Sequence, residues 1–336
     1  MSMILSVVGV TQLCAGCTVV FEPADTLGGR GDPAGPGVIA EVLKTGDGGY
    51  LMSSDLLGGV VVVYDSEGRF LRELTREGDG PGELRGFPEF AMGPGGILVH
   101  EQFAPSLHLY SSGLDFIRTF RVPGIPGSVQ PDPVTGGWLV SYMGAGDGSE
   151  AGIHLLDRRG EVVRTMPVGE ESSSLSLMAG DAIRGTDGRI WIASMLGVVE
   201  VFDENLELLG SLELELPGLA GWSPATGPAA PPAMVLSMRP APDGSGVWVF
   251  AFAPVIDPSE IRRSQGPRPP VEEEFDTFVY SLRLDPSGLT LVGTDQLDTL
   301  VRPLNDGDLA YDLVETPDGN RRVRIGRLRF AGTESR

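Results

Sequence analysis

The chain contains almost no cysteine, little positive charge and no long apolar run. Its 336 residues include two Cys, both within the first 17, so the rest of the sequence offers no disulfide. Lys and Arg number 25 against 46 Asp and Glu, and the resulting net charge of −21 repels polyphosphate. We therefore expect no nucleic-acid partner, and we expect self-repulsion to keep the protein soluble and monomeric.

The first 17 residues, MSMILSVVGVTQLCAGC, resemble a bacterial lipoprotein signal. The segment is apolar and ends in small residues before Cys17, as secretory segments do at their cleavage zone. It is too short to cross a bilayer as a lasting helix. It predicts an exported protein, periplasmic or anchored in the outer membrane through a lipid on Cys17, with no other membrane contact. A misassigned start codon and a simple buried strand are the alternatives.

Glycine and proline, in contrast, are abundant and scattered at turn spacings. The 48 Gly and 27 Pro indicate many short strands. Strand ends recur every 46 residues, which is typical of a propeller or solenoid, at Asp65, Ser111, Asp157 and Asp203. A short turn follows each of them, in which Asp or Ser is expected to bond the turn amides. Gly or Asn is expected to take the positive φ, at Gly68, Gly113, Gly160 and Asn205.

A second glycine-containing hairpin lies upstream of each of these strands, so each unit supplies four strands, which is one propeller blade. A fifth unit carries an insertion at about 253–277, and a sixth has only three strands. The segment Val19 to Leu27 is expected to join the last blade and leave no open edge. We predict an all-β, six-bladed propeller of four-stranded antiparallel blades over residues 18–331, followed by a tail, 332–336.

The run from Gly78 to Phe120, which begins GDGPGELRGFPEF, resembles the NHL-repeat type of six-bladed propeller. That resemblance implies the fold rather than the function, since such propellers include scaffolds, sugar or peptide binders and enzymes. It also implies that GDGPGEL is the crossover from one blade to the next. A phosphate-binding loop would need a completing Lys or Ser/Thr and a following helix, and neither is present.

One face of the predicted disc carries minimal hairpins, and the other, the long-loop face, collects longer and more varied connections. The latter include residues 55–59, 100–106, 142–152, 194–197 and 253–277, together with the crossovers between blades. Function on a repeated scaffold normally lies in such loops. The candidate ligand contacts on this face are Asp55, Glu101, Tyr142, Asp147, Arg262 and Arg263.

Two functions fit this arrangement. The first is an exported, non-enzymatic module that binds a protein, peptide or glycan at the long-loop face without a cofactor. The alternative is a metal-dependent hydrolase, lactonase-like or esterase-like, that holds Ca²⁺ or another divalent ion in the central channel. The ligands would then be the acids predicted just after a second strand, Asp55, Glu101 and Asp147.

The chain has three histidines, and their positions do not favour a zinc site. His108 and His154 occupy the same place in their repeats, which predicts ordinary half-buried strand residues. His100 begins a loop beside Glu101 and has no histidine counterpart in the other blades. A zinc site would need several such ligands to converge. We therefore do not expect the zinc-dependent lyase chemistry that the NHL resemblance would allow.

Overall fold

The computed structural model describes residues 18–28, 40–54, 57–101, 104–122, 124–143, 152–167, 181–219, 233–241, 244, 246–255, 275–305, 307–315 and 321–331. All regular elements in these ranges are β-strands. No helix of the described residues is long and apolar enough to cross a membrane.

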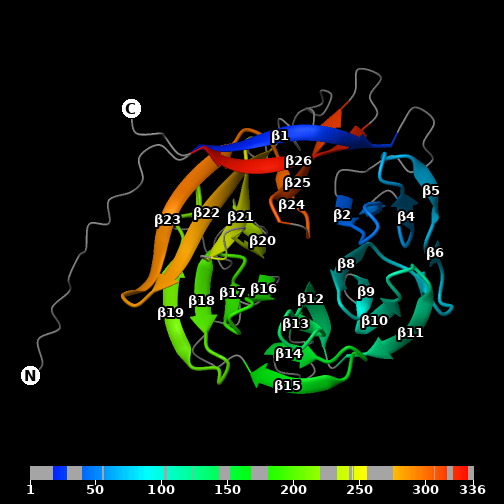
Figure 1. Ribbon diagram of the computed structural model, residues 1–336, viewed down its shortest axis with the longest axis horizontal. Coiled ribbons are helices and arrows are strands. Elements are labelled where there is room, and N and C mark those ends of the chain that lie inside the picture. The colour runs from blue at the N-terminus through cyan, green and yellow to red at the C-terminus, as the bar shows by residue number, and fades with distance from the viewer. Residues whose placement is uncertain are drawn as a thin grey trace, which may run out of the picture.

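Six four-stranded antiparallel sheets surround a central axis, as predicted (Figure 1). From the innermost strand outward, blade one is β2 (Ala40–Lys44), β3 (Tyr50–Ser54), β4 (Val61–Tyr64) and β5 (Phe70–Glu73). Blade two is β8 (Pro88–Gly93), β9 (Gly96–Glu101), β10 (Ser106–Tyr110) and β11 (Phe116–Arg121). Blade three is β12 (Ile125–Pro131), β13 (Trp138–Met143), β14 (Gly152–Leu156) and β15 (Val162–Pro167).

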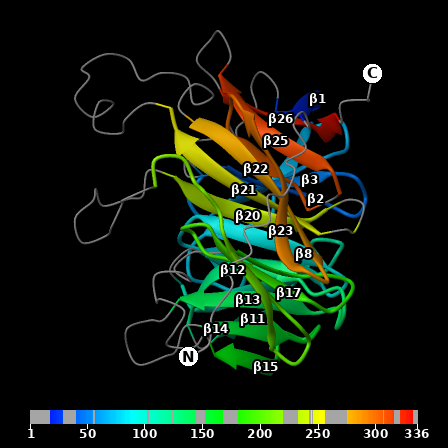
Figure 2. The ribbon, with the colours of Figure 1, turned by 90° about the vertical axis from the view of Figure 1, so that its left-hand side faces the viewer.

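Blade four is β16 (Asp181–Arg184), β17 (Ile190–Ala193), β18 (Val198–Phe202) and β19 (Leu208–Glu213). Blade five is β20 (Met234–Pro240), β21 (Val247–Pro254), β22 (Phe275–Asp285) and β23 (Gly288–Leu297). Blade six is β24 (Val301–Pro303), β25 (Leu309–Glu315), β26 (Arg321–Ala331) and, outermost, β1 (Thr18–Leu27). Figure 2 shows blade three, with β14 and β15, at one end of the molecule and blade six, with β25, β26 and β1, at the other.

The ring closes through the first strand, as the sequence predicts. β1 pairs antiparallel with β26, from Thr18 opposite Ala331 to Leu27 opposite Val323. Val19 packs into a cluster formed by blades five and six, and Leu27 packs into the cluster between blades six and one. The N-terminal strand therefore covers the outer edge of blade six and contributes to both of its interfaces.

The hydrophobic core is divided into six clusters, each shared by two neighbouring blades. The alternation of side chains along a strand explains this arrangement, because successive residues point to opposite faces of the sheet. In β3, Leu51 packs toward blade two, whereas Tyr50 and Met52 pack toward blade six. Both faces of the strand are buried along Tyr50 to Met52, and these residues are accordingly all hydrophobic.

The outer strand pair of each of the first five blades carries a β-bulge at an equivalent place. In every case the extra residue is an exposed aliphatic side chain, namely Leu71, Ile117, Val163, Leu209 and Val292. A bulge increases the local twist and interrupts the ladder, which protects an outer edge strand from pairing with another chain.

The tight turns follow the predicted hydrogen bonding but differ in which residue takes the positive φ. Asp or Ser accepts from turn amides in each, as where Asp203 Oδ1 accepts from Asn205 N at 2.8 Å. The positive φ falls three residues after the Asp or Ser in all four repeats, so in two of them it falls on a leucine. Leu114 and Leu206 have φ values of 68° and 74°, and the expectation for Gly113 and Asn205 is wrong. Both leucines pack against interblade clusters, which offsets the backbone strain.

The GDGPGEL stretch is a crossover, as predicted, and leads from β5 to β8. The two residues just before this stretch, β6 (Arg76–Glu77), pair in parallel with its last two residues, β7 (Glu83–Leu84). Within it, Gly80 N donates to Glu83 Oε2 at 2.8 Å, and the Tyr110 hydroxyl donates to Gly82 O at 3.1 Å. The loop is thus bonded to itself and to blade two.

Adjacent residues of β1 provide a matched test of ring closure. Val19 is 2% exposed and Val20 is 41% exposed. We expect Val19→Asp to lower the free energy of unfolding by about 3 kcal/mol or more, because it buries a charge without a partner. Val20→Asp should change it by less than about 0.5 kcal/mol. Denaturant unfolding measures both, and equal effects of the two variants would contradict the docking of β1.

Candidate functional site

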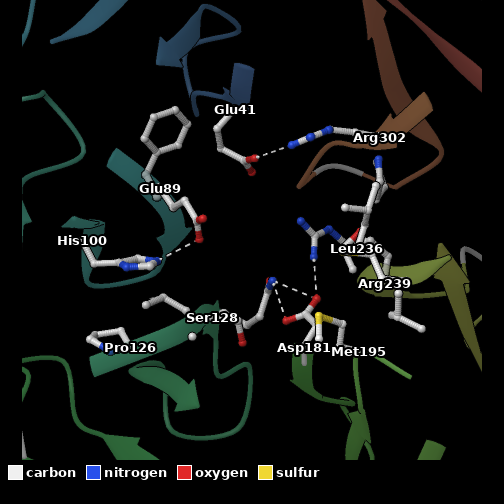
Figure 3. Close-up of a pocket in the computed structure, with 18 of the residues that line it drawn as sticks. Glu41, Glu89, His100, Pro126, Ser128, Asp181, Met195, Leu236, Arg239 and Arg302 are labelled. Atoms are coloured by element: carbon white, nitrogen blue, oxygen red, sulfur yellow. Dashed lines mark hydrogen bonds and ion pairs between the residues drawn. The ribbon is translucent and has the colours of Figure 1, made fainter. Parts of the chain in front are cut away.

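The inner strands of the ring surround a central cavity of about 420 Å³. A volume in this range accommodates a small molecule. All six inner strands contribute a polar side chain to the lining: Glu41 from β2, Glu89 from β8, Ser128 from β12, Asp181 from β16, Arg239 from β20 and Arg302 from β24. Figure 3 shows these side chains converging on the cavity from different blades.

Asp181 ties three blades together at one side of the cavity. The carboxylate of this buried residue accepts from Met238 N of blade five at 2.8 Å and from Gln130 Nε2 of blade three at 3.2 Å. Its own blade supplies the Ala182 amide at 2.9 Å. Burial raises the pKa of Asp181, and the guanidinium of Arg239, with Nη1 3.7 Å away, opposes that rise. These contacts give Asp181 a structural role in holding the blades in place.

Arg239 extends this network to blade six. Its Nη1 donates to Met238 O at 2.7 Å, and its Nε donates to Leu304 O, just beyond β24, at 3.3 Å. The guanidinium therefore has protein acceptors on two sides in addition to Asp181. This part of the lining is a connected hydrogen-bond network that joins blades three, four, five and six.

The opposite part of the lining joins blades six and one through Glu41 and Arg302. Glu41 Oε2 lies 3.7 Å from Arg302 Nη1, and the two side chains are 26% and 19% exposed. Burial raises the pKa of Glu41 to about 7; the Arg302 guanidinium opposes this rise and the nearby Glu89 carboxylate adds to it. Tyr311, opposite Arg302 in the register, is buried, and its pKa is well above the usual value. Glu41 is thus able to exchange a proton near neutral pH.

Glu89 and His100 form the third group, on blade two. The two residues are paired in the register of β8 and β9, and His100 Nε2 lies 3.2 Å from Glu89 Oε2. The imidazole is almost fully buried, and its Nδ1 has no hydrogen-bond partner among the described residues. The Oγ of Ser237, on the cavity lining, likewise has none there. The sequence placed His100 at the start of a loop, whereas it lies within β9 and lines the central cavity.

The described residues do not form a metal centre of the usual kind. Within the ranges that the structure covers, no group of three or more His, Cys, Asp or Glu side chains is arranged to hold a metal ion. Of the acids expected to bind such an ion, Asp55 and Asp147 lie outside these ranges.

Glu101 lies away from the central cavity and contacts the crossover loop. Its Oε2 accepts from Arg85 N at 2.9 Å and from Gly86 N at 3.2 Å, and its Oε1 is 3.7 Å from His108 Nε2. Glu101 lines a second, more open hollow between the crossover and blade two, together with Glu83. Its carboxylate therefore holds the GDGPGEL crossover against the blade.

Tyr142 is a core residue of blade three. It is almost fully buried in the cluster between blades two and three, and its ring meets the His154 ring edge-on at 4.4 Å between centroids. Its hydroxyl has no hydrogen-bond partner within the described ranges. The structure does not bring Tyr142 and Glu101 together at the central cavity.

The other two histidines are strand residues, as expected, although buried rather than half-buried. His108 Nδ1 lies 3.0 Å from Thr119 Oγ1, and His154 Nδ1 lies 2.9 Å from Thr165 Oγ1, an equivalent pairing with the outer strand in both blades. The remaining predicted functional residues, Asp55, Asp147, Arg262, Arg263 and Cys17, lie outside the described residues.

Sequence reasoning missed the charged residues that line the cavity, Glu41, Glu89, Asp181, Arg239 and Arg302. A signal for three of them was present. Each is the second residue of a mainly apolar inner strand, as Glu41 is in AEVLK, Glu89 in PEFAMG and Arg302 in VRP. A charge in a strand predicted to lie innermost points to the channel, because the rest of the strand faces interblade cores.

No protein-family model matches the chain, and neither does any curated protein sequence. Solved structures do resemble it. One, described as a "putative exported protein" of Bacteroides fragilis NCTC 9343, has 9% identity and a TM-score of 0.61 over 96% of this chain and 98% of that one. A member of the DUF4221 family from Bacteroides vulgatus ATCC 8482 has 11% identity and a TM-score of 0.58 over 94% and 99%. At such identities the likeness concerns the fold, and it agrees with a six-bladed propeller.

The raised pKa of Glu41 predicts a pH dependence of stability. The folded protein favours the protonated carboxyl, so the stabilising contribution is complete below about pH 4.5 and is lost as the pH rises through about 7. Between about pH 5 and pH 8, we expect the free energy of unfolding to fall relative to Glu41→Gln by on the order of 1–3 kcal/mol. Denaturant unfolding across this range measures it. Glu73→Gln, on the exposed outer strand β5, is the control and should follow the wild-type protein. If the free energy of unfolding changed with pH in the same way in the wild type, Glu41→Gln and Glu73→Gln, the prediction would be contradicted.

The contacts of Glu101 predict a local effect on the crossover. Glu101→Ala removes the acceptor of two backbone amides, and we expect a loss of about 1 kcal/mol in stability and faster amide exchange at Arg85 and Gly86. Glu101→Gln keeps an acceptor oxygen and should retain most of the protection. Hydrogen exchange resolved to these amides measures the difference, and unchanged protection in Glu101→Ala would show that the carboxylate does not hold the loop.

Proposed function

We propose that the protein is an exported, non-enzymatic propeller that binds a ligand in its central cavity, with access from the long-loop face. The observation that carries this proposal is the cavity itself, which combines polar groups from all six blades with an apolar wall that includes Met234, Leu236 and Phe252. Small-molecule sites are of this kind, concave and largely apolar with a few oriented polar groups. Phe87, in the crossover before β8, and Met195, in the tight turn between β17 and β18, also line the cavity. A protein, peptide or glycan that docks on the face is expected to reach the cavity there.

Export is supported by the N-terminal segment that ends at Cys17, and it agrees with the description of the similar Bacteroides fragilis protein. A periplasmic or outer-membrane location through a lipid on Cys17 belongs to the same proposal. We also propose that the repeat is of the NHL type, that the protein is a monomer and that it has no nucleic-acid partner.

Binding without a metal is favoured over metal-dependent hydrolysis by the geometry of the acids. Glu101, one of the three carboxylates expected to bind a metal, is turned toward the crossover and away from the channel. The three cavity acids Glu41, Glu89 and Asp181 are each within 4 Å of a cationic or imidazole group. Among the described residues, no three His, Cys, Asp or Glu side chains are arranged to hold a divalent ion together.

This preference predicts the response to chelation. We expect the purified full chain to contain no stoichiometric divalent ion by elemental analysis, and its thermal midpoint to stay unchanged after treatment with EDTA. A bound ion whose removal lowers the midpoint would move the proposal to the hydrolase, and Asp55→Asn and Asp147→Asn would then be tested for loss of the ion.

The location of the site is tested by filling the cavity. Leu236 is half-buried on the cavity lining, so the larger side chain of Leu236→Trp is expected to fill part of the cavity. Leu71→Trp, at an exposed position on the outer strand β5, is the control. Ligands from a mixed set of sugars, short peptides, amines and acids are to be identified by the rise in thermal midpoint of the wild-type protein. We expect the rise to vanish in Leu236→Trp and to persist in Leu71→Trp. Persistence in both would place binding outside the cavity.

A further inference from the structure

The polar groups of the cavity are divided by blade into donors and acceptors. The guanidinium of Arg239 donates to two backbone carbonyls and lies beside Asp181, and that of Arg302 lies beside Glu41. The Arg239 guanidinium and the Nη1 of Arg302 therefore already face protein acceptors. An anionic ligand would have to displace these contacts to bind them.

The acceptors on blades one and two are more accessible. The Glu41 and Glu89 side chains are 26% and 30% exposed, and Figure 3 shows both pointing into the cavity. The position of His100 adds a third acceptor. When its Nε2 carries the proton and donates to Glu89, Nδ1 presents a lone pair, and this buried atom has no partner in the described structure. A ligand with N–H donors would satisfy it.

The charges of the lining point in the same direction. Glu41 and Glu89 place two carboxyl groups on blades one and two, of which Glu41 is only partly ionised near pH 7, and the whole chain carries −21. A low-dielectric cavity focuses such a field and attracts cations. Across the cavity from Glu89, Figure 3 shows the Arg239 guanidinium beside Asp181, with the apolar side chains of Leu236 and Met195 on the same side.

We propose that the cavity binds an organic ammonium group, with the cationic head at Glu41, Glu89 and His100 and an apolar body against Met195, Leu236 and Phe252. This inference rests on the proposed function, because it names the chemical class of the ligand for the same cavity. An ammonium group presents three N–H donors and a positive charge that suits the carboxylates of Glu41 and Glu89, whereas a neutral hydroxyl donates once and a carboxylate would be repelled.

The protonation of Glu41 couples this binding to pH. Glu41 is faced by Arg302 from β24, Glu89 from β8, His100 from β9 and Arg239 from β20. Its raised pKa shows that these cations do not compensate for its burial, so a bound ammonium would favour the ionised form and release a proton near pH 7. An alkylammonium stays protonated over this range, since such groups titrate near 10. Affinity is therefore expected to rise between about pH 6 and pH 8.

The test compares three probes of similar size and different head group: phenethylamine, 2-phenylethanol and 3-phenylpropionate. Isothermal titration calorimetry of the full chain is expected to give at least about ten-fold tighter binding of the amine than of the alcohol, and no binding of the carboxylate. Titrations near pH 7 in buffers of different ionisation enthalpy should show release of a proton on amine binding.

Variants then assign the binding to these residues. Glu89→Gln is expected to weaken amine binding about ten-fold, and Glu73→Gln on the outer strand should leave it unchanged. A thermal midpoint close to that of the wild-type protein establishes that Glu89→Gln is folded. If that variant is unfolded, Glu41→Gln replaces it, with the added expectation that proton release disappears.

The possible failures are distinguishable. Equal or tighter binding of the alcohol or the carboxylate would overturn the ammonium inference and leave a ligand-binding cavity. Failure of all three probes at millimolar concentration would also overturn it, while a different ligand that responds to Leu236→Trp would keep the proposed function. Amine binding that survives Leu236→Trp would place the site elsewhere and overturn both.

Discussion

The pairing of the two ends of the chain is the constraint on which this structure depends. β1 and β26 are almost as far apart in sequence as two strands can be, and their ladder supplies the fourth strand of blade six. Among the described residues, no blade has a core of its own, because each hydrophobic cluster is shared by two neighbours. An open ring would therefore expose the facing sides of two blades, and the apolar area lost from burial would weaken both. Closure makes the six blades one cooperative unit, and it also brings the inner strands to a common cavity.

Buried polar contacts then fix how the blades are oriented. Asp181 links blades three, four and five, and Arg239 continues the chain of contacts to blade six. At the hairpin end of blades three and four, Arg184 Nη1 donates to the fully buried Asp132 at 3.2 Å. Burying such charges is costly unless they are paired and hydrogen-bonded, so the blades can move relative to each other only if several bonds are lost together. Apolar packing alone would tolerate small rotations, whereas these bonds define one arrangement of the channel.

The regular part of the fold could be predicted because its causes are local. The spacing of 46 between Asp65 and its counterparts reports turn chemistry that each repeat needs for itself, and it gave the blade architecture. The positive φ at Leu114 and Leu206 was missed because the hydrogen bonds to Ser111 and Asp203 set the turn geometry, and packing accommodates a leucine there. The bulges at Leu71 and Ile117 were missed because an exposed aliphatic residue does not show from the sequence that it is unpaired in the ladder.

The candidate site could not be predicted in the same way, because it depends on closure. Glu41 and Arg302 are distant in sequence and meet only where blade six adjoins blade one. Glu101 and Tyr142 follow the loop positions of their repeats, yet Glu101 bonds the crossover and Tyr142 packs in a core. Position within a repeat locates a residue along the strand, but the direction of its side chain depends on the neighbouring blade.

The cavity differs from the rest of the molecule in that it does not follow the repeat. Turns, bulges and interblade clusters recur from blade to blade, whereas the second residue of an inner strand is Glu41 in β2, Glu89 in β8, Pro126 in β12 and Arg302 in β24. The lining consequently carries Glu41 and Glu89 on blades one and two, and the Asp181–Arg239 pair together with the apolar Met234 and Leu236 on blades four and five. A symmetric ligand or a water-filled pore needs no such difference between sides. A ligand with two unlike ends does, because each end must meet a different wall, and the asymmetry of the lining is therefore the feature on which the proposed binding of one oriented molecule rests.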